Sequence, residues 1–348
     1  MQALVVTPGT ADSLELVDLP EPPESEGPVL VESLMVGLCG TDAEIVDGLY
    51  GTPPPGQDHL VLGHENLGRV RQAPAETGLS EGDLVVGIVR RPDPVPCPAC
   101  ADGQWDMCRN GRYTERGIKG LHGFARELWR AEPTAMVRLD PALSRLGVLL
   151  EPTTIVAKAW EQMERIGRRA WFDPKVAVVT GAGPIGLLAA LLGVQRGLEV
   201  HVFDLVTDGP KPDLVRDLGA AYHTESVPES GMQGDVLVEC TGVPSVVLDV
   251  MTHSAPDSIT CLTGISGTGK TMPVDVAALN RDQVLSNDVI FGSVNANRGH
   301  YTAAAEALCR ADPSWLARMV SRTVPLSEFA EAFAPRPEDV KVILGMQV

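Results

Sequence analysis

Residues 176–190, VAVVTGAGPIGLLAA, decide the fold of the second half of the chain. An apolar run of strand length ends at Gly181, a helix-like run follows Gly183, and with Gly186 these residues form a G-x-G-x-x-G pattern. The first glycine permits a tight turn, the second lets the backbone approach a pyrophosphate, and the third lets the helix pack on the strand. The helix N-terminus adds a positive end that favours an anion. The stretch therefore predicts a dinucleotide-binding turn.

The sequence around this turn alternates between strand-like and helix-like runs. Strands are expected at residues 175–181, 198–204, 235–242, 258–264 and 288–295, and helices at residues 184–197, 211–219 and 244–255. Such alternation is typical of a parallel, doubly wound α/β sheet that is covered by helices. We therefore expect a Rossmann domain in this part of the chain.

An acidic residue at the end of the second strand bears on the choice of cofactor. Asp204 lies 18 residues after Gly186, where a carboxylate can accept hydrogen bonds from the ribose hydroxyls of NAD and would repel the 2′-phosphate of NADP. Lys211 follows closely and could still allow NADP, while the alternative is that Asp204 only caps a strand. We expect NAD to be preferred and NADP to be possible. The full set of expected cofactor-binding residues is Gly181, Gly183, Pro184, Ile185, Gly186, Asp204, Thr241 and Asn295.

The first 150 residues show a different pattern from this strand and helix alternation. Short strand-like runs, broken by glycine and proline, cover residues 1–8, 28–39, 66–72, 83–91 and 127–139, which is an all-β pattern. The tail has a helix-like run at residues 301–311, a second one at residues 326–333 and a last strand at residues 339–345. We find no internal repeat and no low-complexity linker.

Composition limits the classes of function. The 348 residues, 44% of them apolar, suit two domains, and a formal net charge of −18 argues against nucleic acid or an anionic membrane as a partner. The first residues read as a strand rather than a signal peptide, and the longest helix-like apolar run, residues 185–194, is about half the length that spans a bilayer. Seven cysteines, an odd number, fit a reducing compartment. A soluble, cytoplasmic protein is expected.

A metal site is expected in the β-rich half. Cys39 and Thr41 lie in VGLCGTDAEI, and His64 and Glu65 lie in LVLGHENLGRV. Singly, Cys39 reads as a small buried residue and His64 as a core histidine. Beside a nicotinamide fold they indicate a catalytic zinc, which needs about three protein ligands and an open position. Glu65, or Glu151 in VLLEPTTIVAKAW, would supply the oxygen ligand.

In combination, GLCGTDAE, GHE, GAGPIG and LLEP resemble the zinc-dependent medium-chain dehydrogenase/reductase family over essentially the whole chain. Three further stretches, YTERGIKGLHGFARE, NRDQVLSNDVIFGSVNANRGHY and VPLSEFAEAF, resemble its glucose (aldose) 1-dehydrogenase branch. The resemblance implies zinc-dependent oxidation of the C1 hydroxyl of an aldose, D-glucose to gluconolactone above all, with hydride transfer to NAD(P). It also implies a GroES-like catalytic domain at residues 1–157 and 303–348, and a Rossmann domain at residues 158–302.

The resemblance also assigns roles to individual residues. Cys39 and His64 match zinc ligands, Glu65 matches an acid that binds zinc directly or through water, and Glu151 matches a ligand that swings on and off the metal. Thr41 matches the hydroxyl that relays the proton of the alcohol. Glu115 and His300 match polar residues that contact sugar hydroxyls in the family. Asn295 lies in a segment that, by the same resemblance, lines the nicotinamide and the substrate. The alternatives are a surface salt bridge for Glu115 and a helix-start histidine for His300.

Several rival functions remain open. Some aldose dehydrogenases carry an asparagine just before the arginine pair, where this chain has Val89, so that the substrate could be another sugar, a polyol or an amino alcohol such as threonine. A silent dinucleotide-binding relative and a zinc-free quinone reductase are disfavoured, because Cys39, Thr41 and His64 are all present. The resemblance further suggests a homodimer or homotetramer.

A second cysteine pattern remains. Cys97, Cys100 and Cys108 match the last three positions of the family's structural zinc lobe, C-x2-C-x2-C-x7-C, while Pro94 occupies the first. The neighbouring Asp93 could replace the missing ligand, since a carboxylate can complete a tetrahedral site. Asp102 and Asp106 are weaker candidates. The lobe could hold a structural zinc or be an empty, reduced loop.

Overall fold

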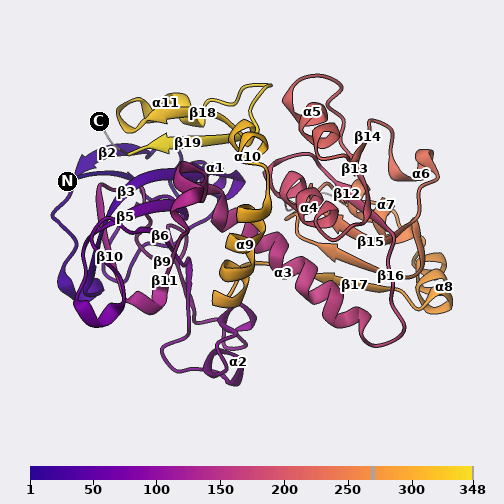
Figure 1. Ribbon diagram of the computed structural model, residues 1–348, viewed down its shortest axis with the longest axis horizontal. Helices are drawn as coiled ribbons and strands as arrows, with labels where there is room; N and C mark the ends of the chain where they lie inside the picture. The colour runs from indigo at the N-terminus through magenta and orange to yellow at the C-terminus, as the bar shows by residue number, and fades with distance from the viewer. Residues whose placement is uncertain (268–270, 347–348) are drawn as a thin grey trace. The chain divides into compact units, whose positions relative to one another are not determined.

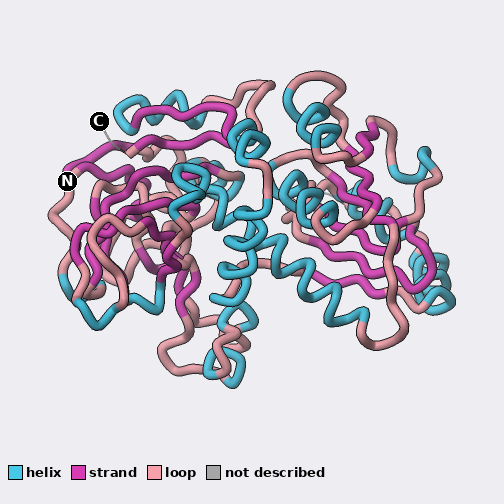
Figure 2. The backbone as a smooth tube through the Cα atoms, viewed as in Figure 1, coloured by secondary structure: helices cyan, strands magenta, loops and turns pink. Residues whose placement is uncertain are grey.

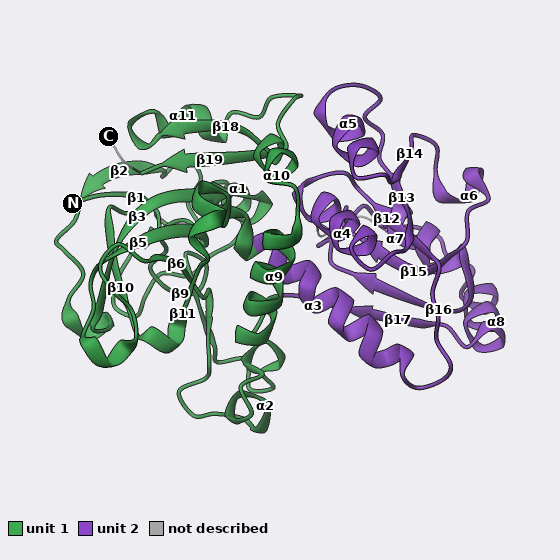
Figure 3. Ribbon diagram, viewed as in Figure 1, with its two compact units in different colours: residues 1–151, 295–348 green, residues 152–294 purple. Residues whose placement is uncertain are grey.

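The computed structural model describes residues 1–267 and 271–346 of the chain. The chain divides into two compact units, one formed by Met1–Glu151 with Asn295–Val348 and the other by Pro152–Val294 (Figures 1 and 3). The first unit is therefore discontinuous in sequence. The expected domain limits at 157/158 and 302/303 fall within helices α3 and α9, and they remain a prediction. The boundary after Glu151 lies in α3, whereas the boundary after Val294 lies before α9 begins.

The second unit is built on one parallel sheet with strand order β14-β13-β12-β15-β16-β17 (Figure 1). Figure 2 shows its strands in magenta and the helices around them in cyan. Its strands are β12 Val176–Thr180, β13 Glu199–Phe203, β14 Ala221–His223, β15 Gly234–Glu239, β16 Ser254–Leu262 and β17 Val289–Gly292. Strand order reverses between β12 and β15, and in such sheets ligands bind outside the carboxyl ends of the strands at this point. The expected doubly wound α/β sheet is confirmed.

Helices cover both faces of this sheet. They are α3 Leu150–Gly167, α4 Pro184–Val194, α5 Pro210–Asp217, α6 Val227–Ser230, α7 Pro244–Thr252 and α8 Val276–Ser286. Helix α4 packs on β12 and β13 and contacts α5, while α7 packs on β15 and β16 and contacts α8. Crossovers between parallel strands are right-handed as a rule, so a sheet whose strand order reverses carries helices on both faces. The apolar run of α4 is buried along most of its length, and Trp160 of α3 packs on it, donating from Nε1 to the carbonyl of Ala189 at 3.2 Å. This packing holds the start of α4 against β12.

Within its described residues, 1–151 and 295–346, the first unit contains three sheets. The largest has the order β11-β6-β5-β3-β19-β18 with β10 also paired to β3, and the others are β2-β1-β4 and β7-β8-β9. The strands of these three sheets are β1 Gln2–Val6, β2 Glu15–Asp18, β3 Val29–Leu38, β4 Leu60–Val61, β5 Glu65–Gln72, β6 Leu84–Gly87, β7 Arg90–Arg91, β8 Thr114–Arg116, β9 Gly120–Leu121, β10 Leu128–Ala131, β11 Met136–Arg138, β18 Val320–Pro325 and β19 Lys341–Gly345. This β-rich unit agrees with the expected GroES-like fold.

Short helices connect these strands. The α-helices are α1 Gly40–Val46, α2 Pro98–Ala101, α9 Arg298–Arg310, α10 Pro313–Met319 and α11 Phe329–Phe333. The 3₁₀ helices are η1 Glu24–Glu26, η2 Ala75–Thr77, η3 Trp105–Met107, η4 Pro133–Ala135, η5 Pro141–Leu149 and η6 Leu326–Glu328. Strand β19 from the end of the chain lies antiparallel to β3, so the C-terminal tail completes the central sheet.

Some expected elements differ in extent. The helix expected from residue 301 begins at Arg298, because the Asn297 side chain caps it by accepting the N–H of Gly299 at 2.9 Å. Helix α8 was not expected from the sequence. None of its described side chains is buried, and a helix without a buried face lacks the apolar periodicity by which a helix is predicted. No helix within the described residues is long and apolar enough to cross a membrane.

Candidate metal and cofactor sites

Cys39 lies between the end of β3 and the start of α1. Its backbone N–H donates to Asp42 Oδ2 at 3.0 Å, an acidic residue in the first turn of the helix that is fully buried. This contact fixes the turn that presents the cysteine. Thr41, the second residue of α1, is half-buried. The sequence reasoning missed Asp42, although an acidic residue at the third position of a helix is a known N-terminal signal.

His64 faces Cys39 from just before β5. The distance between Cys39 Sγ and His64 Nε2 is 3.2 Å, and the other ring nitrogen, Nδ1, lies 3.4 Å from Asp42 Oδ1. The second pair is close enough for an ion pair but is not aligned as a hydrogen bond, and both atoms are buried. Burial alone would lower the pKa of His64, but the neighbouring Cys39 and Asp42 outweigh it and hold the pKa well above its usual value. The two side chains thus form a buried site that attracts positive charge.

Glu65 is the first residue of β5 and contacts a lysine that the sequence reasoning missed. Lys341 Nζ lies 2.6 Å from both carboxylate oxygens of Glu65 and donates also to the carbonyl of Leu38 at 3.0 Å. Both side chains are buried. The separation of 276 residues in sequence gives no local signal of the pairing. Glu65 is therefore neutralised by Lys341, which favours an indirect role for it over permanent metal ligation.

Glu151, the second residue of α3, is also buried. Burial, together with the nearby Glu65, raises the pKa of its carboxyl to about 7, although His64 and Lys341 partly oppose the shift. The geometric cluster of metal-ligating atoms within 4.8 Å of one another holds Cys39, His64 and Glu65. Glu151 shares their electrostatic environment without belonging to that set.

The raised pKa of Glu151 predicts a pH dependence of the metal-free protein. Between about pH 4.5 and 7 the unfolded chain ionises Glu151 while the folded chain keeps it protonated, so the free energy of unfolding falls as pH rises through this window. The loss is on the order of 3 kcal/mol. Urea denaturation of the chelated protein across this range, beside Glu151→Gln, measures it. An identical pH profile for the two proteins would contradict the prediction.

These donors fit a zinc ion. A thiolate, an imidazole whose far nitrogen faces a carboxylate, and buried acids nearby are the ligands and supporting groups that zinc prefers. Without a cation, His64 Nε2 and the Cys39 sulfur must share one proton across 3.2 Å. A metal ion replaces that proton and satisfies both groups.

A second group of buried polar side chains surrounds Glu115 in β8. Arg90 donates from Nε to Glu115 Oε1 at 3.0 Å, and Asn295 donates from Nδ2 to the same oxygen at 2.7 Å. The guanidinium of Arg90 lies 3.8 Å from the ring centre of Tyr113. Glu115 is 5% exposed, so it forms a buried ion pair rather than a surface one. Asn295 is thus brought to Glu115, within the first unit.

His300 lies in the first turn of α9 and is buried. Its Nδ1 accepts the backbone N–H of Asn297 at 3.1 Å and lies 3.9 Å from Asp106 Oδ2. Asn297 Nδ2 also donates to Asp106 Oδ1 at 2.9 Å. His300 therefore helps to cap its helix. A neutral ring in this arrangement carries its proton on Nε2, the nitrogen that could donate to a hydroxyl.

Val89, the position at which a related asparagine could have contacted substrate, belongs to the hydrophobic core. It is 2% exposed, and its backbone N–H donates to the Tyr301 hydroxyl at 3.2 Å. Its side chain packs as a core residue, so the missing amide is not replaced by a polar group at this position.

The glycine-rich turn in the second unit has the expected geometry. Gly181 has a φ of +88°, which favours glycine, and a Cβ at Gly186 would lie 1.7 Å from the carbonyl oxygen of Gly181. Gly183 is the N-cap of α4, with Pro184 and Ile185 in the first turn. The N-terminus of α4 therefore lies at the carboxyl end of β12, as a pyrophosphate site requires.

Asp204 follows β13 and contacts this turn. Its Oδ2 accepts the N–H of Ala182 at 2.6 Å, Oδ1 accepts the N–H of Val206 at 3.0 Å, and Lys211 Nζ lies 3.9 Å from Oδ2. Asp204 is thus more than a strand cap, since it joins the two loops at the carboxyl ends of β12 and β13. Lys211 is close enough to weaken the repulsion of a 2′-phosphate.

Thr241 lies in the loop after β15, where a buried acid that the sequence reasoning missed organises the backbone. Glu239 Oε1 accepts hydrogen bonds from the N–H and hydroxyl of Thr241 and from the N–H of Gly242 at 3.0 Å. Thr180 of β12 donates to the same oxygen at 3.5 Å. Glu239 therefore links the ends of the two central strands, and it places Thr241 near the switch point of the sheet.

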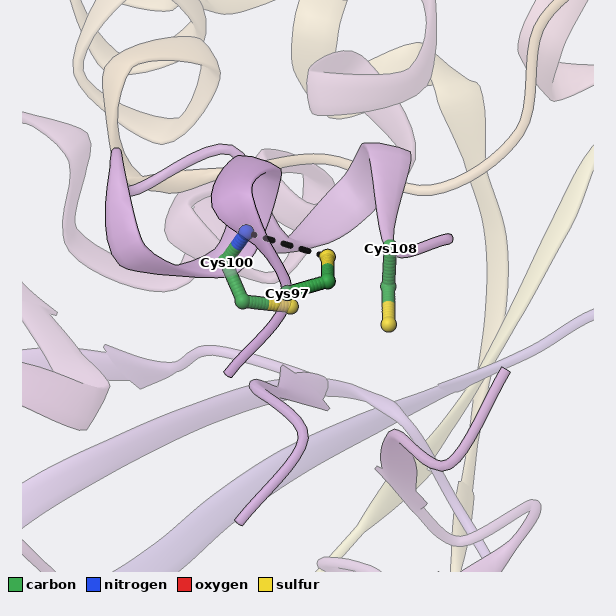
Figure 4. A group of neighbouring side chains, drawn as sticks. All are labelled: Cys97, Cys100 and Cys108. Atoms are coloured by element: carbon green, nitrogen blue, oxygen red, sulfur yellow. Dashed lines mark hydrogen bonds between the residues drawn. The ribbon is translucent and has the colours of Figure 1, made fainter. Parts of the chain in front are cut away.

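The three clustered cysteines lie around α2 and η3 in the first unit (Figure 4). One sulfur from each lies within 4.8 Å of the others. The carboxylate of Asp93 accepts the N–H of Val95 at 2.8 Å and the Nδ2–H of Asn110 at 2.9 Å, and it pairs with Arg112 at 3.4 Å. The carboxylate of Asp93 therefore interacts with Val95, Asn110 and Arg112 and does not belong to the group of three sulfurs.

Comparisons with known proteins match two successive parts of the chain. Residues 25–141 match the family model of the alcohol dehydrogenase GroES-like domain, and residues 144–346 match that of the glucose dehydrogenase C-terminus. A glucose 1-dehydrogenase of Methanocella arvoryzae is 39% identical, with 99% of both chains covered, and one of Thermoproteus tenax is 38% identical, with 100% of both covered. The solved structure of Haloferax mediterranei glucose dehydrogenase in complex with NADP, Zn and gluconolactone has a TM-score of 0.92 and 34% identity, covering 100% of both chains.

Proposed function

The chain belongs to the zinc-dependent medium-chain dehydrogenase/reductase family, in its glucose 1-dehydrogenase branch, and we propose that it oxidises the C1 hydroxyl of an aldose to the lactone with NAD(P). D-glucose is the proposed substrate. The observation that carries the proposal is the set of half-buried Cys39 and buried His64 and Glu65 in a chain that also has the dinucleotide-binding turn. The relative solved with NADP, Zn and gluconolactone, at 34% identity over the whole chain, supports the same reaction.

The proposed reaction removes a proton from the C1 hydroxyl and a hydride from C1, which leaves the lactone. A bound zinc ion would supply a Lewis acid that lowers the pKa of the hydroxyl, and NAD(P) would accept the hydride. Cys39 and His64 would hold the metal, with Asp42 orienting the His64 ring. We assign the proton relay to the hydroxyl of Thr41, two residues after Cys39. Glu65, held by Lys341, and Glu151 would adjust the charge of the site.

The buried polar groups around Glu115 and His300 would recognise the sugar by hydrogen bonds to its hydroxyls. A polyhydroxyl substrate is recognised by hydrogen bonds, because loss of one leaves a buried polar group unpaired at a cost of about 1–3 kcal/mol. Glu115 can accept from a hydroxyl with its second oxygen, while Arg90 and Asn295 fix the first. An enzyme for simple aliphatic alcohols would be expected to line this space with apolar groups.

The proposal is tested by initial rates with a panel of aldoses, linear polyols, threonine and simple alcohols, each with NAD and NADP. Aldoses, and D-glucose above all, are expected to have the highest kcat/KM. Faster turnover of a linear polyol or of threonine would replace the aldose by that substrate class. Full activity after complete removal of zinc would contradict the zinc-dependent reaction itself.

NAD is the cofactor that we propose to be preferred, with NADP accepted. Asp204→Ser is expected to lower the ratio of kcat/KM with NAD to that with NADP by at least about tenfold, because a hydrogen bond to a charged group contributes about 1.5–3 kcal/mol. Asp208→Ser, which changes an exposed acid in the same loop, is the matched control. An unchanged ratio in Asp204→Ser would mean that another group decides the cofactor.

We also propose that the protein is a homo-oligomer in the cytoplasm. Strand β17 is an edge of its sheet, and an unpaired edge favours pairing with a second copy. Large apolar side chains are exposed in α8 and the segments before it: Ile265, Met272, Val274, Val276, Val284 and Leu285. Several large apolar side chains exposed in one segment of a chain are a common feature of an interface. Sedimentation equilibrium tests the assembly, and a monomer at micromolar concentration would contradict it.

A further inference from the structure

We propose that Cys97, Cys100 and Cys108 form a three-thiolate zinc site whose fourth ligand is a small molecule from solvent rather than a residue of this chain. The site is separate from the proposed sugar oxidation and does not depend on it. Its distinguishing property is an open, exchangeable coordination position in a place where a closed structural site would have four protein ligands.

The three sulfurs are already arranged for a metal ion. They lie within 4.8 Å of one another, and the Cys97 sulfur accepts the N–H of Cys100 at 3.5 Å and of Arg109 at 3.4 Å (Figure 4). Backbone N–H donors stabilise a thiolate, the form that binds metals, and they fix its position. Cys97 caps α2, and Cys108 follows η3, so that each sulfur is held by a separate turn of the backbone. The lobe therefore positions three soft ligands without metal.

The nearby carboxylates do not complete the set. Asp93 is engaged by Val95, Asn110 and Arg112, and Asp106 accepts from Asn297. The third candidate, Asp102, is exposed and accepts the Nε2–H of Gln104 at 2.7 Å. Within residues 1–267 and 271–346, no further histidine, cysteine, aspartate or glutamate joins the three sulfurs in a group with all ligand atoms within 4.8 Å of one another. The chain thus offers three ligands in position, not four.

The segment before Cys97 supplies no fourth side-chain ligand. Pro94, Val95 and Pro96 have no ligand atom in their side chains, and all three are exposed to solvent. Zinc in proteins is almost always four-coordinate, so a metal held by three sulfurs takes its last ligand from the surrounding solution. Water fills that position in simple buffer, and a small thiol, which is a softer ligand, would displace it.

The test uses Co²⁺ as a spectroscopic substitute for zinc in the full-length chain carrying His64→Ala, which removes a ligand from the other metal site. Co²⁺ is expected to bind with a strong sulfur-to-metal charge-transfer band, and Cys108→Ser should abolish that band. Addition of 2-mercaptoethanol should change the visible cobalt spectrum. Pro94→Cys in the same background should bind Co²⁺ at least about tenfold more tightly, and its spectrum should no longer respond to the thiol.

Asp93→Asn provides the matched control, because it removes the carboxylate that is the strongest candidate for a fourth ligand and keeps the shape of the side chain. An unchanged cobalt spectrum in this variant is expected. A weaker or shifted spectrum in Asp93→Asn would identify Asp93 as the fourth ligand and overturn the proposal. Failure of the Pro94-containing chain to bind Co²⁺ while Pro94→Cys binds it would show that three thiolates do not suffice. If the cobalt spectrum of the chain that retains Pro94 does not change when 2-mercaptoethanol is added, the site is closed and the proposal is wrong.

Discussion

Cys39→Ala and His64→Ala are each expected to lower kcat/KM for the preferred aldose by at least about 10³-fold while leaving NAD(P) binding unchanged. Each substitution removes one of the two ligands whose atoms face each other at 3.2 Å. Loss of a Lewis acid costs several kcal/mol of transition-state stabilisation, and about 4 kcal/mol corresponds to about 10³-fold in rate. The glycine-rich turn and Asp204 belong to the second unit, so cofactor binding should persist.

Three measurements separate this effect from misfolding. Zinc content by elemental analysis should fall, the dissociation constant of NAD(P) by fluorescence titration should stay within about twofold, and urea denaturation should remain cooperative. Cys309→Ala and His59→Ala are the matched controls, because Cys309 is exposed in α9 and the His59 side chain contacts the exposed Asp58 and stacks on His122. Both controls should keep the full rate. Turnover near the original rate in either Cys39→Ala or His64→Ala would remove the catalytic zinc from the proposed mechanism.

The second unit could be predicted from sequence because its signals are local. An apolar strand, a glycine-rich turn and an apolar helix follow one another at residues 176–194, and an acid follows the next strand. Parallel sheets are built from such consecutive strand and helix pairs, so the sequential order largely determines the neighbours. Helix α8 was missed for a physical reason: its described side chains are not buried in the chain alone, and an exposed helix carries no periodic apolar signal.

The candidate site shows where sequence reasoning stops. Cys39, His64 and Glu65 lie in short motifs, and the structure brings them together from two adjacent strand ends. Two supporting residues of this metal site were missed. Asp42 left a local trace, since it lies three residues after Cys39. Lys341 left none, because it reaches the site only through the pairing of β19 with β3, more than 300 residues apart in sequence. The pairing of β19 with β3 therefore brings in Lys341, the residue that balances the charge of Glu65.

Lys341→Met is expected to lower the free energy of unfolding of the chelated protein by about 3–5 kcal/mol, because it leaves the Glu65 carboxylate buried without its cation. Both groups are at most 3% exposed, so water cannot replace the lost ion pair. Burial alone would lower the pKa of Lys341, but Glu65 and Cys39 outweigh it and raise the pKa, so the lysine is charged at neutral pH. Urea denaturation followed by circular dichroism measures the effect.

The double variant Glu65→Gln/Lys341→Met decides whether the loss comes from the stranded charge. With both charges removed, the desolvation cost of the pair disappears together with its attraction, and replacing a buried ion pair in this way is often close to neutral. We therefore expect the double variant to recover most of the stability that Lys341→Met loses. Equal destabilisation in the two variants would instead assign the effect to lost packing around the lysine side chain or to its contact with the Leu38 carbonyl. Recovery of stability without recovery of kcat/KM would show that Glu65, oriented by Lys341, is needed for the reaction as well as for folding.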